Sequence, residues 1–278
     1  MRVSNVLVEE SFQFTEDKPD MLYRGMEIDS LDKVADYCKN IGERIKFSDD
    51  LYEVQVQDEV ALYEYLYASK GAGSDDDRRR LLEMLSKKCQ YKTDEDGDVE
   101  IRVSLGKYQD CASNFQEYIG DRRALLAEMQ NVQEYEAFMH SCFPNSHFAK
   151  NILREMRYIK DFPRNAKEIT ENLSVLDDEA LELYREHHTN LKEAIDILGV
   201  RLKACSPDPA HVSDLLFPFE YEEIVNGENV AREKMVVCSP HLKLIRGGSN
   251  LRIYFEWCDK DVGNGEKVLI GRIGRHPY

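Results

Sequence analysis

The sequence predicts an α+β protein of two domains, a mixed domain over residues 1–143 and helices packed on an antiparallel meander over residues 144–278. Three observations support this prediction. Helical and strand-like periodicities alternate through the first half of the chain. A cluster of turn-forming residues stands at residues 142–146, and the pattern changes from helical to strand-like after Pro209.

The N-terminal half alternates strand-like and helix-like segments. Partial alternation of apolar residues over 1–14 predicts an opening strand. Ser30 is a favourable N-cap, and apolar residues at helical spacing behind it predict a helix that ends near Gly42. Ser74 is the predicted N-cap of a later helix. The remaining predicted elements are a helix over 58–70, a strand over 99–105 and a helix over 121–138.

The C-terminal half begins with helices and ends with strands. Helices are predicted over 147–160, 166–173 and 177–198; acidic residues at the start of the last and Gly199 at its end suit the helix dipole. The Asn226-Gly227 pair predicts a two-residue hairpin turn. The predicted strands cover 219–225, 234–238, 241–246, 251–257 and 267–273.

Composition excludes several classes of protein. Hydrophobic residues make up 42% and charged residues 32%, which is typical of a globular chain with a core. No run approaches the ~20 apolar residues of a membrane span, and the N-terminus lacks a secretory signal pattern. We therefore expect a cytoplasmic protein that does not bind membranes.

Motifs for common cofactors and metals are also missing. The seven cysteines form no C-x-x-C pair, so we interpret them as buried thiols in a reducing compartment. P-loop, Rossmann, serine-hydrolase and zinc-protease motifs are absent, and we expect neither a cofactor nor a metal.

The charge is uneven along the chain. A net charge of −16 argues against a general affinity for nucleic acid. Residues 231–278, however, hold nine Lys or Arg and five Asp or Glu. The basic surplus therefore lies at the C-terminus.

The segment HLKLIRGGSNLRIYFEW, residues 241–257, predicts a hairpin with one polar face. If residues 247–250 form a four-residue loop, His241 faces Glu256 and Lys243 faces Tyr254. Arg252 joins them on this face, whereas the other face is apolar. A solvated strand surface with cross-strand ion pairs would show the same pattern, and a one-residue slip would change which residues oppose each other.

The last segment, KVLIGRIGRHPY, adds further candidates. Gly271 and Gly274 predict a bent strand or a close backbone approach. Together, this segment and residues 241–257 hold a histidine, a tyrosine, a glutamate and several cations. Such side chains supply groups for proton transfer and for stabilising a phosphorane. The polar side chains of this segment are Arg272, Arg275, His276 and Tyr278.

Helices followed by a meander and a final strand ending in Arg-x-x-Arg-His-x-Tyr resemble the RelE/ParE toxin superfamily, above all the RelE, YoeB and HigB-type messenger-RNA endonucleases. The segment GSNLRIYFEW is similar to the strand of that family with an Arg-Ile-x-Phe run. The resemblance covers at most residues 144–278. The same ending, H-x-K-L…R-I-x-F…I-G-x-I-G-x-H, also resembles uncharacterised bacterial proteins of mobile or defence loci.

The resemblance implies metal-free cleavage of RNA, in which the 2′-hydroxyl attacks the adjacent phosphate. It implies His276 or Glu256 as general base, and His276, His241 or Tyr278 as general acid. The implied charge-stabilising or substrate-binding residues are Lys243, Arg252, Tyr254, Arg272 and Arg275.

Three functional hypotheses follow. The first is a toxin-like endoribonuclease acting on RNA or the ribosome in a toxin–antitoxin or antiphage system. The second is a non-catalytic subunit that binds a protein partner, such as an antitoxin or a defence-complex subunit. In the third, the C-terminal sheet pairs along an edge with another chain. The family's toxins are small and basic, so the acidic residues 1–143 are a predicted inhibitor or partner-docking module.

Overall fold

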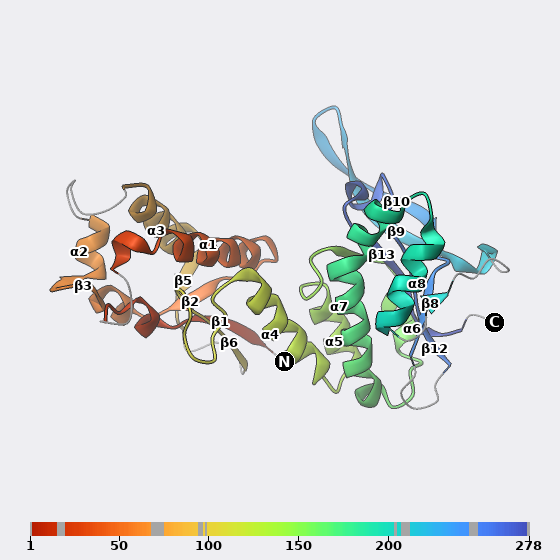
Figure 1. The fold of residues 1–278 in the computed structure, drawn as a ribbon, viewed down its shortest axis with the longest axis horizontal. Helices are drawn as coiled ribbons and strands as arrows, with labels where there is room; N and C mark the ends of the chain where they lie inside the picture. The colour runs from red at the N-terminus through yellow and green to blue at the C-terminus, as the bar shows by residue number, and fades with distance from the viewer. Residues whose placement is uncertain are drawn as a thin grey trace. The chain divides into compact units, whose positions relative to one another are not determined.

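The computed structural model describes residues 2–15, 20–67, 75–93, 97, 99–202, 205–206, 212–244 and 250–276. The chain divides into two compact units, Met1–Arg122 and Arg123–Tyr278. This division falls inside helix α4 (Phe115–Ala127), upstream of the boundary predicted after residue 143. Helices and several separate sheets are present, which confirms the α+β class (Figure 1).

The first unit contains a four-stranded sheet in the order β5-β2-β1-β6, with every pair parallel. Parallel neighbours need crossover connections. Helix α1 (Gly25–Asn40) links β1 to β2, and helix α3 (Asp75–Lys87) lies between β2 and β5 in the chain. The strands are β1 (Val3–Leu7), β2 (Ile45–Phe47), β5 (Cys89–Tyr91) and β6 (Val99–Val103).

Two predicted elements of this unit were wrong in extent. Helix α1 begins at Gly25, so Ser30 lies inside it and its hydroxyl donates to the Met26 carbonyl. Buried Ile28 extends the apolar stripe upstream of the predicted cap. The predicted helix over 58–70 begins too early: residues 58–61 belong to a short hairpin, and the helix covers Leu62–Tyr67 of the described residues. These elements, with the 3-10 turns of the unit, are η1 (Glu9–Phe12), η2 (Met21–Tyr23), η3 (Asp49–Glu53), β3 (Gln55–Gln57), β4 (Val60–Ala61) and α2 (Leu62–Tyr67).

The second unit contains a five-stranded sheet in the order β7-β13-β12-β11-β8. The predicted antiparallel meander corresponds to β11, β12 and β13; β7 adds a parallel strand at one edge and β8 an antiparallel strand at the other. The strands are β7 (Ser146–Phe148), β8 (Cys205–Ser206), β11 (His241–Lys243), β12 (Leu251–Glu256) and β13 (Val268–Arg275).

The remaining two strands, β9 (Leu216–Val225) and β10 (Glu228–Val237), form a separate antiparallel hairpin. Asn226 and Gly227 join them, and both residues have positive φ angles, 54° and 86°. These angles confirm the predicted two-residue turn, because such turns need left-handed backbone at their centre.

Helices α5 (Val132–Met139), α6 (Ile152–Met156), α7 (Phe162–His187) and α8 (Leu191–Leu202) complete the second unit. The predicted helix over 121–138 is two helices, because the Asn131 side chain caps α5 by accepting from two backbone N–H groups. The predicted helix over 177–198 is also wrong: α7 starts upstream and ends at His187. None of the described helices combines the length and apolarity that a membrane crossing requires.

One face of the C-terminal sheet packs on these helices, as the apolar pattern of the hairpin predicted. Its buried side chains are Leu242, Leu244, Leu251, Ile253, Phe255 and Trp257. The observed pairing places His241 opposite Tyr254 and Lys243 opposite Arg252, two residues away from the predicted register. The predicted assignment of residues to the two faces is still correct, because side chains along a strand return to the same face every two residues.

A bulge bends β13 at Gly271. Tyr254 pairs with Arg272 whereas Phe255 pairs with Ile270, so Gly271 is the extra residue. A Cβ at this position would lie 2.4 Å from the Phe217 ring and 2.7 Å from the Cys238 sulfur. The close backbone approach predicted from the glycines is therefore confirmed here, and it holds the base of the β9–β10 hairpin against the sheet.

We predict that Gly271→Ala lowers the free energy of unfolding by about 1–3 kcal/mol, the usual cost of overpacking a core. Chemical denaturation of both variants would test this. Gly120→Ala is the matched control, since a Cβ at this helical position meets nothing within 4 Å. The control should be neutral or stabilising by up to ~1 kcal/mol, and equal losses in both variants would contradict the packing argument.

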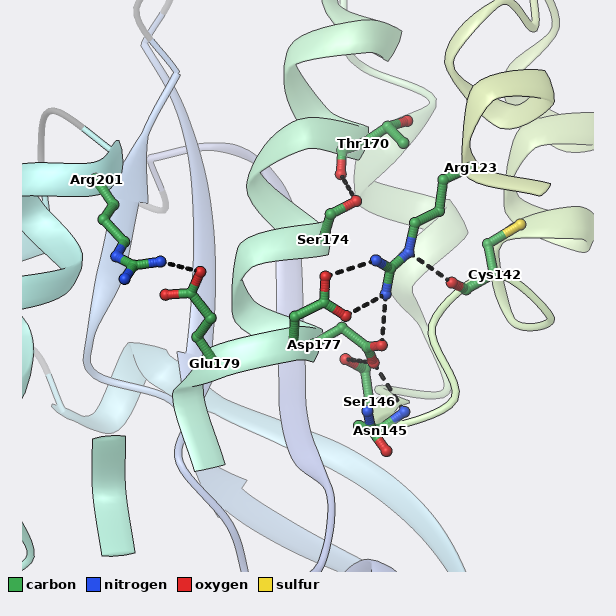
Figure 2. Close-up of polar contacts among 10 residues, drawn as sticks. Arg123, Cys142, Asn145, Ser146, Thr170, Ser174, Asp177, Glu179 and Arg201 are labelled. Atoms are coloured by element: carbon green, nitrogen blue, oxygen red, sulfur yellow. Dashed lines mark hydrogen bonds and ion pairs between the residues drawn. The ribbon is translucent and has the colours of Figure 1, made fainter. Parts of the chain in front are cut away.

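Arg123 anchors the start of the second unit to α7 (Figure 2). Its guanidinium lies 2.7 Å from both Asp177 and Asp178, and its Nε donates to the Cys142 carbonyl. Asp177 is buried and also accepts from the Asn145 backbone and the Ser146 hydroxyl. The carboxylate therefore fixes the chain just before β7.

Arg123→Met should cost about 3–5 kcal/mol, because it leaves the buried Asp177 carboxylate without its cation. Arg201, which pairs with Glu179 near the surface (Figure 2), provides the control. Arg201→Met should change stability by less than ~1 kcal/mol. Thermal unfolding of both variants distinguishes a buried anchor from a surface pair.

Candidate functional site

Two imidazoles and a phenol meet on the face of the C-terminal sheet away from helices α7 and α8. The β11–β12 pairing sets His241 beside Tyr254, with ring centroids 5.0 Å apart. The His276 backbone donates to the Asn250 carbonyl, so the chain stays paired beyond the end of β13. The His276 ring then lies 6.4 Å from His241 and 6.2 Å from Tyr254. We call these three residues the imidazole cluster.

The members of the cluster differ in exposure. Tyr254 is 0% and His241 5% exposed, whereas His276 is partly exposed. Ser206, on the edge strand β8, places its hydroxyl 3.2 Å from Nε2 of His241. His276 is therefore the more accessible of the two imidazoles, and Ser206 helps to orient the buried one.

Three cations accompany the cluster. Lys243 lies opposite Arg252 across β11 and β12, on the face of the cluster. Arg275 lies opposite Leu251, on the other face of the sheet, and is exposed at the end of β13. None of the three forms an ion pair within the part of the chain that the structure describes. The only hydrogen bond of the Arg252 side chain to these residues runs from Nη1 to the Leu251 carbonyl, at 3.0 Å.

Two predicted site residues have other surroundings than predicted. Arg272 lies opposite Tyr254 in the sheet, but its guanidinium pairs with Glu155 of α6 at 2.9 Å, and both side chains are largely buried, so Arg272 serves packing. Glu256 lies at the far end of β12, next to a different cavity. Three further predictions concern positions that the structure does not describe. They are Tyr278 as a site residue, the loop over 247–250, of which only Asn250 is described, and Ser74 as an N-cap.

Burial strongly perturbs Glu256. Desolvation raises the pKa of its carboxyl from 4.5 to about 7. Its Oε1 accepts from the Trp257 backbone at 3.1 Å. The family resemblance implied His276 or Glu256 as general base. The raised pKa of Glu256 would suit that role, but its place along β12 separates it from His276.

The cluster brings together groups that can take part in proton transfer, because an imidazole can accept or donate a proton. Lys and Arg side chains such as Lys243 and Arg252 form charge-assisted hydrogen bonds with anions. Among the described residues, no group of three or more His, Cys, Asp or Glu is arranged to hold a metal ion. All seven cysteines are free thiols.

Ser206 was missed by the sequence prediction. It belongs to a two-residue strand that carries no periodic signal, and only the pairing of β8 with β11 brings it to His241. No family model, no curated protein and no solved structure matches this chain. The resemblance to the RelE/ParE superfamily therefore stays a prediction from motifs.

The raised pKa of Glu256 predicts a pH-dependent stability. The unfolded chain releases this proton near pH 4.5, while the native state keeps it until about pH 7. The group's contribution is therefore fully present below pH 4.5 and falls as pH rises to 7, by at most about 1.4 kcal/mol per pH unit.

Denaturation of wild type and Glu256→Gln across pH 4.5–8 tests this. Wild type should lose stability relative to the variant over that window. Glu266→Gln, at an exposed position of the same unit, should run parallel to wild type. Parallel curves for Glu256→Gln would show that the carboxyl is not desolvated in the native state.

Proposed function

We propose that this chain is a metal-independent RNA-cleaving protein, with its reaction at the imidazole cluster. One observation carries the proposal: His241 and His276 share a sheet face with Lys243 and Arg252, neither of which has a carboxylate partner among the described residues. Imidazoles supply proton transfer, and the cations supply the site for a phosphate.

Lys243 and Arg252 lie side by side on this face in an acidic protein, whose net charge is −16. Some other cations of the same unit pair with carboxylates, whereas Lys160 and Lys167 are in no ion pair of the described chain. Lys150 lies 2.7 Å from Glu220, and Lys234 lies 2.7 Å from Asp259. A set of cations left without carboxylates favours an anionic ligand, and a phosphodiester satisfies them.

The two imidazoles divide the chemistry of RNA cleavage. One, neutral, takes the proton of the 2′-hydroxyl as its oxygen bonds to phosphorus. The P–O5′ bond breaks, and the other imidazole, protonated, gives its proton to the leaving oxygen. The products are a 2′,3′-cyclic phosphate and a 5′-hydroxyl, so the step consumes no water. Tyr254 acts as a positioning residue through its ring contact with His241.

A second function is favoured by burial. Tyr254 and His241 are almost inaccessible, as expected of core residues. In this alternative the sheet is a non-catalytic binding module that retains the basic face. Its partner would be RNA or another protein, such as an antitoxin or defence-complex subunit. RNA binding without cleavage would identify the module.

The test compares wild type with His276→Ala on single-stranded RNA in the presence of a chelator. We expect a loss of about 10²–10⁴-fold in cleavage rate, the usual contribution of a general acid or base. His188→Ala, at an exposed position of the same unit, should cleave as wild type does. Cyclic-phosphate ends on the products would confirm the 2′-hydroxyl mechanism.

Expression in a bacterial host provides a second readout. A toxin-like effector arrests growth in a way that His276→Ala abolishes and His188→Ala leaves unchanged. Cleavage that persists in His276→Ala would overturn the assignment of the site. Absence of cleavage by all three proteins would favour the binding module.

A further inference from the structure

A mostly apolar cavity lies beside the imidazole cluster, between helix α8 and the edge of the C-terminal sheet. Its volume is about 600 Å³, within the range of small-molecule sites. Leu191 and Ile195 of α8 form one wall, and Pro240 and Trp257 line the sheet side. Helix α8 contacts strand β8 directly, as Figure 1 shows.

Few polar groups enter this cavity, and they differ in character. Glu256 is the most buried of its carboxylates, while Lys192 and Asp196 are exposed on α8. Within the described chain, the Glu256 carboxylate accepts one hydrogen bond, from the Trp257 backbone to Oε1. Oε2 thus remains available to a donor from a ligand, and a desolvated carboxylate gains most from such a donor.

Ser206 connects the cavity to the imidazole cluster. It lines the cavity and its hydroxyl lies 3.2 Å from the His241 ring. Only the Ser206 side chain therefore separates a ligand at this end of the cavity from the His241 imidazole of the proposed catalytic site. This spacing suits a nucleotide whose base is held apart from its phosphate.

We propose that the cavity between α8 and the sheet is a nucleobase-binding site that selects guanine through the Glu256 carboxylate. Apolar walls suit the faces of a base splayed out of a single strand. Guanine presents two adjacent donors, N1–H and N2–H, to the Glu256 carboxylate, which accepts hydrogen bonds only, once it is ionised above about pH 7. Uracil flanks its one N–H with two carbonyl oxygens, which a carboxylate repels.

The inference rests on the proposed function where the guanine belongs to an RNA chain, and is independent of it where the base belongs to a free nucleotide. Lys192 at the rim offers a cation to a phosphate in either case. The experiment therefore has one arm for each source of the base.

The first arm titrates the full-length protein with guanosine 5′-monophosphate and uridine 5′-monophosphate. Trp257 is the chain's one tryptophan and lines the cavity, so its fluorescence reports occupancy. We expect guanosine monophosphate to bind at least about tenfold more tightly, the discrimination of a good bidentate pair. Glu256→Gln should remove this preference, and Glu266→Gln should retain it.

The second arm maps cleavage sites in single-stranded RNA. Cleavage next to guanine in wild type, spread over all bases in Glu256→Gln, supports the RNA source. Guanosine monophosphate binding without any RNA cleavage leaves the cavity assignment standing and overturns the proposed function. Equal binding of both nucleotides, or a preference that Glu256→Gln retains, overturns the guanine site whatever the cleavage result.

Discussion

The C-terminal unit depends on the position of β13 between β12 and β7. This strand makes antiparallel pairs on one side and parallel pairs on the other, and its bulge at Gly271 makes room for Phe217 and Cys238. Val268, Ile270 and Ile273 face the helical core, while Leu269 faces a second core under the β9–β10 hairpin. Because side chains on both faces of β13 pack into a core, the strand and the residues that follow it have a defined position.

That defined position gives the candidate site its geometry. His276 follows β13 and donates its backbone N–H to Asn250, so its ring is carried to the surface of β12 and β11. His241 and Tyr254 lie there as a cross-strand pair. A site built on paired strands is more rigid than one built on loops. His241 and Tyr254 each lie on a strand with a paired neighbour on either side, and His276 is fixed by its backbone bond to Asn250.

Burial and charge divide the polar residues of this sheet into two kinds. Arg272 is neutralised by Glu155 and contributes to packing, whereas Arg252 and Lys243 lie opposite each other and neither pairs with a carboxylate of the described residues. Glu256 is desolvated beside an apolar cavity instead of joining the imidazoles. Among the residues that sequence reasoning grouped as one site, Arg272 is an ion-pair partner, Lys243 and Arg252 are neighbouring cations, and Glu256 lines a cavity.

Local patterns in the sequence determined much of this unit. The Asn226-Gly227 turn, the apolar face of residues 242–257 and the close backbone approach at Gly271 were all predicted. Each follows from strand alternation, from the positive φ that Asn and Gly adopt in a hairpin turn, or from the missing Cβ of glycine. Those same patterns placed His241, Lys243, Arg252 and Tyr254 on one face. Only the tertiary structure decided the register of β11 with β12, which differs by two residues from the predicted one. It also decided the pairing of β8 with β11 and the ion-pair partner of Arg272. It also decided the parallel sheet of the first unit and the break between α7 and α8. These features depend on contacts between segments far apart in the chain, and no local pattern encodes which distant segment provides the partner.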